Sequence, residues 1–384
     1  MAPFDCDVAV IGLGAMGSAA LAQAAARGAK AIGIEARTPA NSLSSSHGDS
    51  RIIRLGYFED PSYVPMLRRA YETWRALERH TGREVLTITG VLQIGRPDSP
   101  IVSGTLASCR EYDLAHEVLD PSAMAARFPA FALDPDEIAV LEHQGGFVRP
   151  EVAVAAHLDW ARANGAELRL DTRVEAIEPD DAGVTLRIGS ERLRAKAVVV
   201  ATGPWIAELV PALRGLAQPI RQVVAWYEPK NKAATALGTM PVFLRDAGPV
   251  GSFFGMPALG PDGVKVGKHA HFREPVGDPD QADAPANARD TDLLDEFIAR
   301  RLPLAAGPRL ATTTCRYTML PGEDFLLDHL PGERRVVVAS PCSGHGYKFA
   351  SVVGEILADL ALEGASRLPV EAFGFEALAR KAAA

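Results

Sequence analysis

The chain has 384 residues, more than one ordinary domain needs and enough for two domains, or for one enlarged α/β domain that carries an insertion. Hydrophobic residues make up 47% of the chain and charged residues 23%, which excludes a disordered or fibrous protein. The net charge of −8 argues against a surface that wraps nucleic acid or lies on an anionic membrane, but it allows a small local basic site.

The four cysteines are too few and too scattered to form a disulfide framework, and neither CxxC nor Cys/His metal-ligand spacing occurs. The N-terminus lacks a basic region followed by an apolar one, and no apolar run approaches the roughly 20 residues that span a bilayer. We therefore expect a cytoplasmic protein with no membrane segment and no metal site.

The first forty residues carry the clearest local pattern. Residues 8–11 form a short apolar run that predicts a buried strand, and a glycine-rich segment at 12–17 follows directly. An alanine-rich stretch then predicts a helix that Gly28 ends, and residues 31–34 predict a second strand with Glu35 at its carboxyl end. This is a βαβ unit of the size that binds dinucleotides.

The three glycines of this unit have separate predicted tasks. Gly12 makes the tight turn, Gly14 lets the backbone approach a pyrophosphate, and Gly17 allows the helix and strand to pack closely. The phosphates would lie at the helix N-terminus, and Glu35 would accept a hydrogen bond from a ribose hydroxyl. The pattern does not separate FAD from NAD, although the acid disfavours NADP.

Further strands with small or glycine-rich turns are predicted at 197–203 and 336–339. The second leads through a glycine turn into an amphipathic helix that Gly364 ends. Between these strands, proline and glycine turns interrupt strand-like alternation, and residues 277–288 read as a surface loop.

The predicted fold class is therefore α/β, with a Rossmann-like dinucleotide-binding domain and an interleaved α+β substrate domain on a mainly antiparallel sheet. We assign residues 1–85, 145–225 and 315–384 to the first domain, and 86–144 and 226–314 to the second.

Four motifs in a fixed order point to a family. They are Ser44–Arg54 with its HGDSRIIR core, Arg221–Val224, Cys315–Tyr317, and Ser343–Lys348, which reads SGHGYK. Over about residues 5–365 the chain resembles the monomeric sarcosine oxidase and N-methyltryptophan oxidase family, FAD enzymes of the D-amino-acid-oxidase-like group. The resemblance implies covalently held FAD, a monomer, and oxidation of a secondary amino acid by O2 to give H2O2.

Cys315 matches the position that links the flavin in that family. It stands next to Arg316, and a neighbouring cation favours the nucleophilic thiolate. The alternatives are that Cys315 is a small buried hydrophobic residue, or that Cys342 is the attachment point. We expect Cys6 and Cys109 to be structural.

Arg54 and Lys348 match the pair that holds the substrate carboxylate, which arginine can grip with two hydrogen bonds. Alone, either would be an ordinary solvated charge. Tyr317 is expected to line the same pocket, and Arg51 matches an arginine close to the flavin ring.

Lys265 matches a lysine that activates O2, where a fixed positive charge would stabilise developing superoxide. A strand would place Lys265 and His269 on one face, with His269 matching an active-site histidine and Lys268 exposed on the other face. His271 shares the parity of these residues and stays open, and His345 reads as a turn residue.

Phe254 departs from the family pattern, because it follows Phe253 where sarcosine oxidases carry two tyrosines. The pocket should therefore be apolar, which leaves sarcosine and bulkier N-methyl or cyclic amino acids open as substrates.

The SGHGYK turn is expected to stabilise negative charge on the reduced flavin through its backbone amides. The glycine unit, the motifs and the resemblance together give the expected cofactor contacts. The expected cofactor contacts are Gly12, Gly14, Ala15, Met16, Gly17, Glu35, Ser45, Arg51, Val174, Gly203, Cys315, Gly344, Gly346 and Lys348. Alternatives are a flavin dehydrogenase with an acceptor other than O2, a fructosyl-amino-acid oxidase, a nucleotide-binding module without turnover, and, least favoured, an NAD dehydrogenase.

Overall fold

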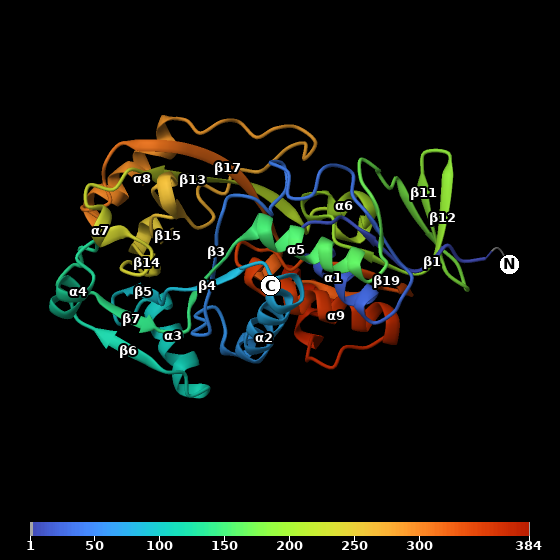
Figure 1. Ribbon diagram of the computed structural model, residues 1–384, viewed down its shortest axis with the longest axis horizontal. Coiled ribbons are helices and arrows are strands. Elements are labelled where there is room, and N and C mark those ends of the chain that lie inside the picture. Colours follow the sequence, from blue (N-terminus) through green and yellow to red (C-terminus); the bar gives the residue numbers. More distant parts are fainter. Residues whose placement is uncertain (1–2, 384) are drawn as a thin grey trace.

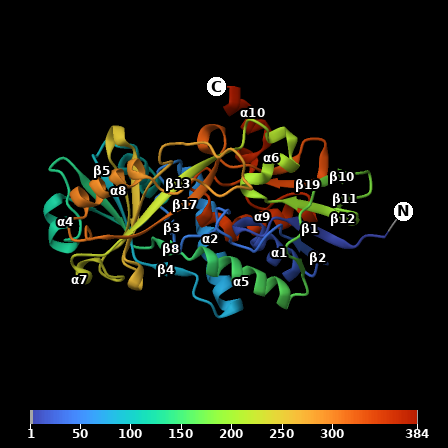
Figure 2. The same cartoon turned by 90° about the horizontal axis from the view of Figure 1, so that it is seen from above.

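A computed structural model describes residues 3–383 of the chain. Two large sheets lie next to each other along the longest axis of the molecule, and a small third sheet lies between them (Figure 1). The N-terminal strand and most of the C-terminal elements belong to one end of the molecule, and the middle of the chain builds the other end (Figure 2).

The first sheet contains the predicted βαβ unit. Its strand β1 pairs in parallel with β2 on one side and with β12 on the other, and β12 pairs in parallel with β19. The predicted strands near residues 8, 31, 197 and 336 are thus neighbours in one sheet. The strands of this sheet are β1 (Cys6–Ile11), β2 (Ala31–Ile34), β9 (Glu167–Arg169), β10 (Ala176–Pro179), β11 (Val184–Ile188), β12 (Glu191–Val200), β18 (Leu327–Leu330) and β19 (Glu333–Ala339).

The second sheet is mainly antiparallel, as predicted, with one parallel pair between β14 and β5. Two long strands, β13 and β17, pair along their lengths and run from this sheet toward the first one (Figure 1). The strands of the second sheet are β5 (Val91–Gly95), β6 (His116–Leu119), β7 (Ile138–Glu142), β13 (Gln218–Tyr227), β14 (Val242–Asp246), β15 (Ser252–Met256), β16 (Val264–Lys268) and β17 (Arg309–Met319).

The small third sheet joins β3 (Arg51–Ile53), β8 (Gly146–Val148) and β4 (Leu86–Ile88). It carries the HGDSRIIR motif between the two large sheets. The division into two domains stays a proposal. Its boundaries at 225/226 and 314/315 fall inside β13 and β17, and both strands belong to the second sheet over their whole length, so a boundary before β13 and one after β17 suit the sheets better.

Helices cover one face of the first sheet. The helix α1 packs against both α9 and α5, with α2 beside them, and small residues allow the close approach. The helices are α1 (Ala15–Ala26), α2 (Val64–Thr81), α3 (Pro100–Glu111), α4 (Pro121–Arg127), α5 (Pro150–Ala163), α6 (Ile206–Leu209), α7 (Lys232–Thr235), α8 (Ala288–Arg301), α9 (Ala350–Glu363) and α10 (Phe375–Ala383). Between residues 3 and 383 no helix has the length and apolar character needed to cross a bilayer.

The segment expected to be a surface loop, 277–288, is anchored at two points. The buried guanidinium of Arg316 donates to Asp283, 3.0 Å away, and to the carbonyl of Pro279. Asp280 accepts from the indole of Trp205 at 2.8 Å and from Arg173 at 2.8 Å. The loop therefore ties the second sheet to the dinucleotide-binding end of the molecule.

The packing of α1 on α9 predicts the effect of a single added methyl group. A Cβ at Gly354 would lie 2.5 Å from the backbone carbon of Ala19. We expect Gly354→Ala to lower the free energy of unfolding by about 1–3 kcal/mol, because the two helices must move apart. Leu362→Ala, at an exposed position of the same helix, should change it by less than about 0.5 kcal/mol in denaturant titrations. Equal effects of the two substitutions would contradict this packing argument.

Candidate active site

One cavity of about 850 Å³ lies between the first and second sheets, and the third sheet forms part of its wall. Of the residues that the sequence singled out as site residues, all but Gly17 line this cavity. They come from the glycine unit, β3, β15–β17 and the turn after β19, so elements far apart in the chain meet here.

The glycines of the βαβ unit are required by close backbone contacts. Gly12 has a φ of +86°, and a Cβ there would lie 2.7 Å from the carbonyl oxygen of Ala201. A Cβ at Gly17 would lie 1.8 Å from the carbonyl oxygen of Gly12. Gly17 therefore packs the helix onto the strand rather than facing the cavity, which agrees with the task expected of the third glycine.

The N-terminus of α1 points at the serine segment before β3. The hydroxyl of Ser46 accepts a hydrogen bond from the amide of Ala15 at 3.0 Å, and a Cβ at Gly14 would lie 3.2 Å from the same oxygen. Sequence reasoning named Ser45 and missed its neighbour Ser46, although both belong to the quoted motif.

Glu35 lies at the end of β2, as predicted, and its carboxylate accepts from the amides of Leu13 (2.8 Å) and Arg37 (3.1 Å). Burial raises the pKa of Glu35, and these two hydrogen bonds oppose the rise. The carboxylate thus reaches the cavity at the place where a ribose would lie in a dinucleotide.

Several buried polar atoms in the cavity wall have no hydrogen-bond partner in the protein. Among them are the hydroxyl of Ser45, Nε2 of His47 and the hydroxyl of Thr202. Since buried polar groups are normally paired, these atoms indicate that the cavity takes a polar ligand. Together with the glycine unit and Glu35, they fit an FAD molecule that would extend from Glu35 toward the SGHGYK turn.

Two cations of the site are held mainly by backbone carbonyls, with one further contact from Lys265 to the Ser50 hydroxyl at 3.4 Å. Arg51 donates to the carbonyls of Ser45 (3.2 Å), His47 (2.6 Å) and Ser50 (2.9 Å). Lys265 on β16 donates to the carbonyls of Gly48 and Ser50, the latter 3.2 Å away. Burial, reinforced by the charge of Arg51, lowers the pKa of Lys265 to about 7.

Lys348 is the third cation of this kind. Its ammonium group donates to the carbonyl of His345 and lies 5.1 Å from the ring centre of Tyr57. Burial and the nearby charge of Arg54 lower the pKa of Lys348 to about 7, although Glu59 acts in the opposite direction. Within residues 3–383 no carboxylate lies within 4.0 Å of the charged groups of Arg51, Lys265 or Lys348.

Arg54 differs from these three cations because it has a carboxylate partner. Its guanidinium donates to both carboxylate oxygens of Glu59, at 2.6 and 2.7 Å, and to the carbonyl of Gly56 at 3.0 Å. The side chain is 2% exposed, which excludes the solvated surface charge considered from the sequence. Arg54 holds the pKa of Glu59 at about 2, against the effect of burial. Sequence reasoning missed Glu59, because nothing in the chain distinguishes it from other acids.

A second buried acid shapes the turn that carries Arg54. Glu142, at the end of β7, accepts from the amides of Leu55 (2.7 Å) and Gly56 (2.8 Å) and is 1% exposed. A Cβ at Gly56 would lie 3.0 Å from Thr105 and 3.2 Å from Glu142. The conformation of the Arg54 turn is therefore fixed by Glu142 of the second sheet and confined by Thr105 of α3, and no local pattern identifies either residue.

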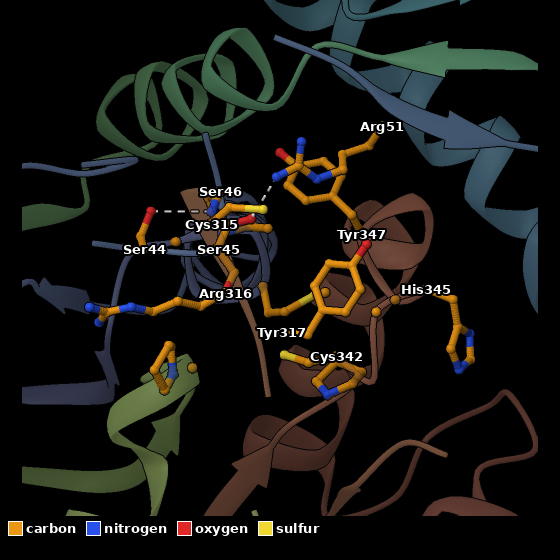
Figure 3. Close-up of a pocket in the computed structure, with 18 of the residues that line it drawn as sticks. Ser44, Ser45, Ser46, Arg51, Cys315, Arg316, Tyr317, Cys342, His345 and Tyr347 are labelled. Atoms are coloured by element: carbon orange, nitrogen blue, oxygen red, sulfur yellow. Dashed lines mark hydrogen bonds between the residues drawn. The ribbon is translucent and has the colours of Figure 1, made fainter. Parts of the chain in front are cut away.

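Cys315 and Cys342 both line the cavity, from β17 and from the turn after β19 (Figure 3). The expectation that Arg316 activates Cys315 is wrong, because the Arg316 side chain binds Asp283. Burial raises the pKa of the Cys315 thiol, while Arg51 and Lys265 oppose that rise. The pKa of Cys342 is raised to about 11 with no cation opposing the rise, so its surroundings favour a thiolate less.

The aromatic and histidine side chains fall into two groups. Tyr317, Phe254 and His269 line the cavity, and the rings of His269 and Tyr317 are 5.6 Å apart. His269 follows directly after β16, so it ends that strand rather than lying in it. In contrast, His271 is buried outside the cavity, where its Nε2 contacts Asp290 at 2.8 Å, and this places it in the structural core.

The structure corrects one smaller expectation, on Lys268, and narrows another, on the SGHGYK turn. The Lys268 side chain is half-buried rather than exposed, and it donates to the carbonyl of His271. In the SGHGYK turn, the amides of His345 (3.0 Å) and Gly346 (2.9 Å) donate to the carbonyl of Cys342. These two amides are therefore used within the turn, and charge stabilisation by the turn would depend on its other amides.

A Rossmann-like sheet, a mainly antiparallel sheet and a cation-lined cavity between them define a dinucleotide-dependent oxidoreductase. The chain belongs to the family described as FAD dependent oxidoreductase, whose model matches residues 7–360. It is an FAD-dependent oxidoreductase, and it is similar to monomeric sarcosine oxidase and N-methyl-L-tryptophan oxidase.

The chain is 40% identical to the monomeric sarcosine oxidase of Streptomyces avermitilis, over 96% of each chain. It is 34% identical to the N-methyl-L-tryptophan oxidase of Citrobacter koseri, over 92% of this chain and 94% of that one. Among solved structures, the open form of the Tyr-to-Phe variant of NikD, an unusual amino acid oxidase of nikkomycin biosynthesis, superimposes with a TM-score of 0.85 at 26% identity, covering 97% of both chains. L-proline dehydrogenase from P. horikoshii shares the fold, with a TM-score of 0.81 at 20% identity.

The lowered pKa of Lys348 predicts how the cavity should bind a carboxylate. Methoxyacetate has a carboxylate and no ionisable amine, so only protein groups titrate near neutral pH. Lys348 is charged below its pKa of about 7 and neutral above it, so the dissociation constant should rise by roughly tenfold as the pH passes upward through that value. The perturbation of flavin absorption on titration measures the binding. Lys348→Met should bind weakly at every pH with a flatter profile, and a profile identical to that of the parent protein would contradict the assignment.

Proposed function

We propose that the protein is an FAD-dependent oxidase of secondary amino acids, either N-methyl or cyclic, that releases H2O2. When bound, FAD supplies the acceptor for the hydride of the amine carbon and, once reduced, the reductant for O2. The resulting imine is hydrolysed by water. The names of the sarcosine and N-methyl-tryptophan oxidase relatives support this substrate class.

The observation that carries the proposal is a set of cations around one cavity, buried at Lys265 and Lys348 and half-buried at Arg51, in a chain of net charge −8. Arg51, Lys265 and Lys348 are held by neutral carbonyl groups, so their charges are not cancelled by a protein carboxylate. Such a cavity attracts anions and stabilises negative charge that develops within it. A substrate carboxylate and an electron-rich reduced cofactor both meet this requirement.

Arg54 and Lys348 are the proposed carboxylate-binding residues. Both line the cavity, and both approach the ring of Tyr57, at 4.4 and 5.1 Å from its centre. Gly56 and Glu59 accept from the two terminal nitrogens of Arg54, whereas its buried Nε has no hydrogen-bond partner among residues 3–383, so Nε is available to a substrate carboxylate. Held in this way, the amino acid would present its amine carbon toward the middle of the cavity.

The remaining residues have proposed roles around this carboxylate site. Phe254 and Tyr317 would enclose the body of the amino acid, and the missing hydroxyl at Phe254 favours a substrate with apolar bulk. His269 would contact the reacting end. Lys265 would provide the positive charge at which O2 is reduced, and Arg51 would lie against the flavin ring.

Cys315 is the proposed attachment point of the flavin. Two cations oppose the effect of burial on its thiol, whereas Cys342 has no such support. We also propose that the protein is a monomer of the cytoplasm, and the name of the Streptomyces relative supports the monomer.

The carboxylate site is tested by substitution in the holoenzyme, with peroxide as the readout over a panel of N-methyl and cyclic amino acids. Arg54→Met and Lys348→Met should each weaken substrate binding by about 2–5 kcal/mol, because each removes one of the two buried partners of the carboxylate. Lys268→Met removes a cation at the end of β16 that does not line the cavity, and should leave KM unchanged. An unchanged KM in both Arg54→Met and Lys348→Met would contradict the proposed carboxylate site.

Flavin attachment is tested by the mass of the denatured protein. We expect the wild-type chain and Cys342→Ser to carry the added mass of one FAD, and Cys315→Ser to carry none. Added mass that persists in Cys315→Ser and disappears in Cys342→Ser would move the attachment point. Flavin reduction by the substrate without peroxide formation would instead indicate a dehydrogenase with another acceptor.

A further inference from the structure

Tyr57 lies behind the carboxylate site and contacts both of its cations. The ring centre is 4.4 Å from the guanidinium carbon of Arg54 and 5.1 Å from the ammonium nitrogen of Lys348. The side chain is 0% exposed and does not line the cavity. Both cations are therefore within cation–π distance of one ring that the substrate does not touch.

The hydroxyl of Tyr57 is fixed by His345. Nε2 of His345 lies 2.8 Å from the carbonyl oxygen of Glu323, which accepts only, so this nitrogen carries the hydrogen. Nδ1 is then the acceptor, and Tyr57 donates its hydroxyl hydrogen to it. Burial lowers the pKa of His345 to about 4, so the ring is neutral and this arrangement holds at neutral pH.

The ring plane and the backbone of Tyr57 are fixed as well. Phe349 packs edge-on against the ring, with ring centres 5.6 Å apart and planes at 82°. Tyr63 packs on it at 5.0 Å, and Ser108 donates to the carbonyl of Tyr57 at 2.6 Å. Tyr57 thus has one orientation, and that orientation faces the cations.

An aromatic face suits this position better than an acid would. Arg54 and Lys348 repel each other in a buried site, and Arg54 contributes to the lowered pKa of Lys348. Glu59 already relieves part of this repulsion, but it occupies a terminal nitrogen of Arg54, and a second carboxylate would occupy further donors that the substrate needs. The negative face of an aromatic ring attracts both cations and uses none of those donors.

We propose that Tyr57 is a positioning residue for the substrate carboxylate: its ring holds Arg54 and Lys348 next to each other, and its hydroxyl, bonded to His345, fixes the ring. This inference rests on the proposed function, since it needs a ligand carboxylate that both cations bind. It predicts that the electron density of the ring, and not only its shape, determines carboxylate affinity.

The test compares holoenzyme variants at this position. Tyr57→Leu removes the aromatic face and should raise both KM for the amino acid and the dissociation constant of methoxyacetate about tenfold, with kcat at saturation within about twofold of the parent value. Tyr57→Phe keeps the face and loses only the hydrogen bond to His345, so methoxyacetate binding should weaken by no more than about threefold. The matched control is Phe325→Leu, which removes a buried ring that stacks on His345 and contacts neither cation.

The pH profile of methoxyacetate binding distinguishes a positioning role of Tyr57 from a general loss of core packing. The charged groups that face Lys348 are Arg54 and Glu59, and His345 is its neutral neighbour. Without the Tyr57 ring, the ammonium loses an attraction while the repulsion from Arg54 remains, so the pH at which binding weakens should shift downward in Tyr57→Leu. Phe325→Leu should lower thermal stability without this shift.

Pentafluorophenylalanine at position 57 provides a variant that keeps the shape of the ring. Fluorination withdraws electron density from the face, so this protein should bind methoxyacetate several-fold more weakly than Tyr57→Phe at similar stability. Equal affinity of the two, or equal changes of KM and pH profile in Tyr57→Leu and Phe325→Leu, would overturn the inference. If the wild-type holoenzyme bound no methoxyacetate, both the proposed function and the inference on Tyr57 would be contradicted. Binding by the wild type that every variant retains would overturn the role of Tyr57 alone.

Discussion

The cavity depends on keeping several positive charges away from water without neutralising them. A buried ammonium or guanidinium group loses its hydration, which costs several kcal/mol unless other groups take its place. In this protein backbone carbonyls take the place of most of that water. Arg51 donates to the carbonyls of Ser45, His47 and Ser50. Lys265 donates to those of Gly48 and Ser50. Because carbonyl groups carry no net charge, the positive potential of the cavity survives. The remaining cost is visible in the lowered pKa values of the two lysines.

This solution requires backbone carbonyls to converge on points in space, and the fold achieves it by bringing loops from three sheets together. The HGDSRIIR segment turns back on itself before β3, and its carbonyls point toward Lys265 on β16 of the second sheet. The turn after β19 presents the carbonyl of His345 to Lys348. A substitution that moved either turn would remove the carbonyl partners of Lys265 or Lys348 and leave a buried ammonium group without hydrogen bonds. The burial of these charges therefore requires the turns to keep their conformation.

Arg54 differs from these cations, because a protein carboxylate stabilises its buried charge and also occupies part of its guanidinium. Its guanidinium is buried with Glu59 as a partner, so a protein carboxylate balances this charge. A ligand carboxylate would share Arg54 with Glu59, and the repulsion between the two carboxylates would reduce the affinity of the site. Tyr57 and Glu142 act on this balance from outside the cavity, the first through its ring and the second by fixing the backbone of the Arg54 turn.

Patterns that depend on neighbours in the chain were predictable. The βαβ unit, its glycines, the helix ended by Gly364 and the antiparallel character of the second sheet all follow from local periodicity and turn chemistry, and the structure confirms them. Arg54, Lys265 and Lys348 were recognised through a family resemblance carried by their motifs. Spacing alone would have left each of them an ordinary surface charge.

Residues whose role depends on contacts with distant parts of the chain were not predictable from the sequence. Glu59 and Glu142 are acids without a motif, Tyr57 is one of seven tyrosines, and the anchored loop at 277–288 has the composition of a free surface segment. Likewise, Arg316 directly follows Cys315 in the chain, yet its side chain binds Asp283 instead of acting on the Cys315 thiol. By itself the sequence determined which backbone elements form and which motifs meet at the ends of strands. Only the tertiary structure decided which charges are paired, since the partner of a buried ion is set by distance in space, and residues far apart in the chain supply it.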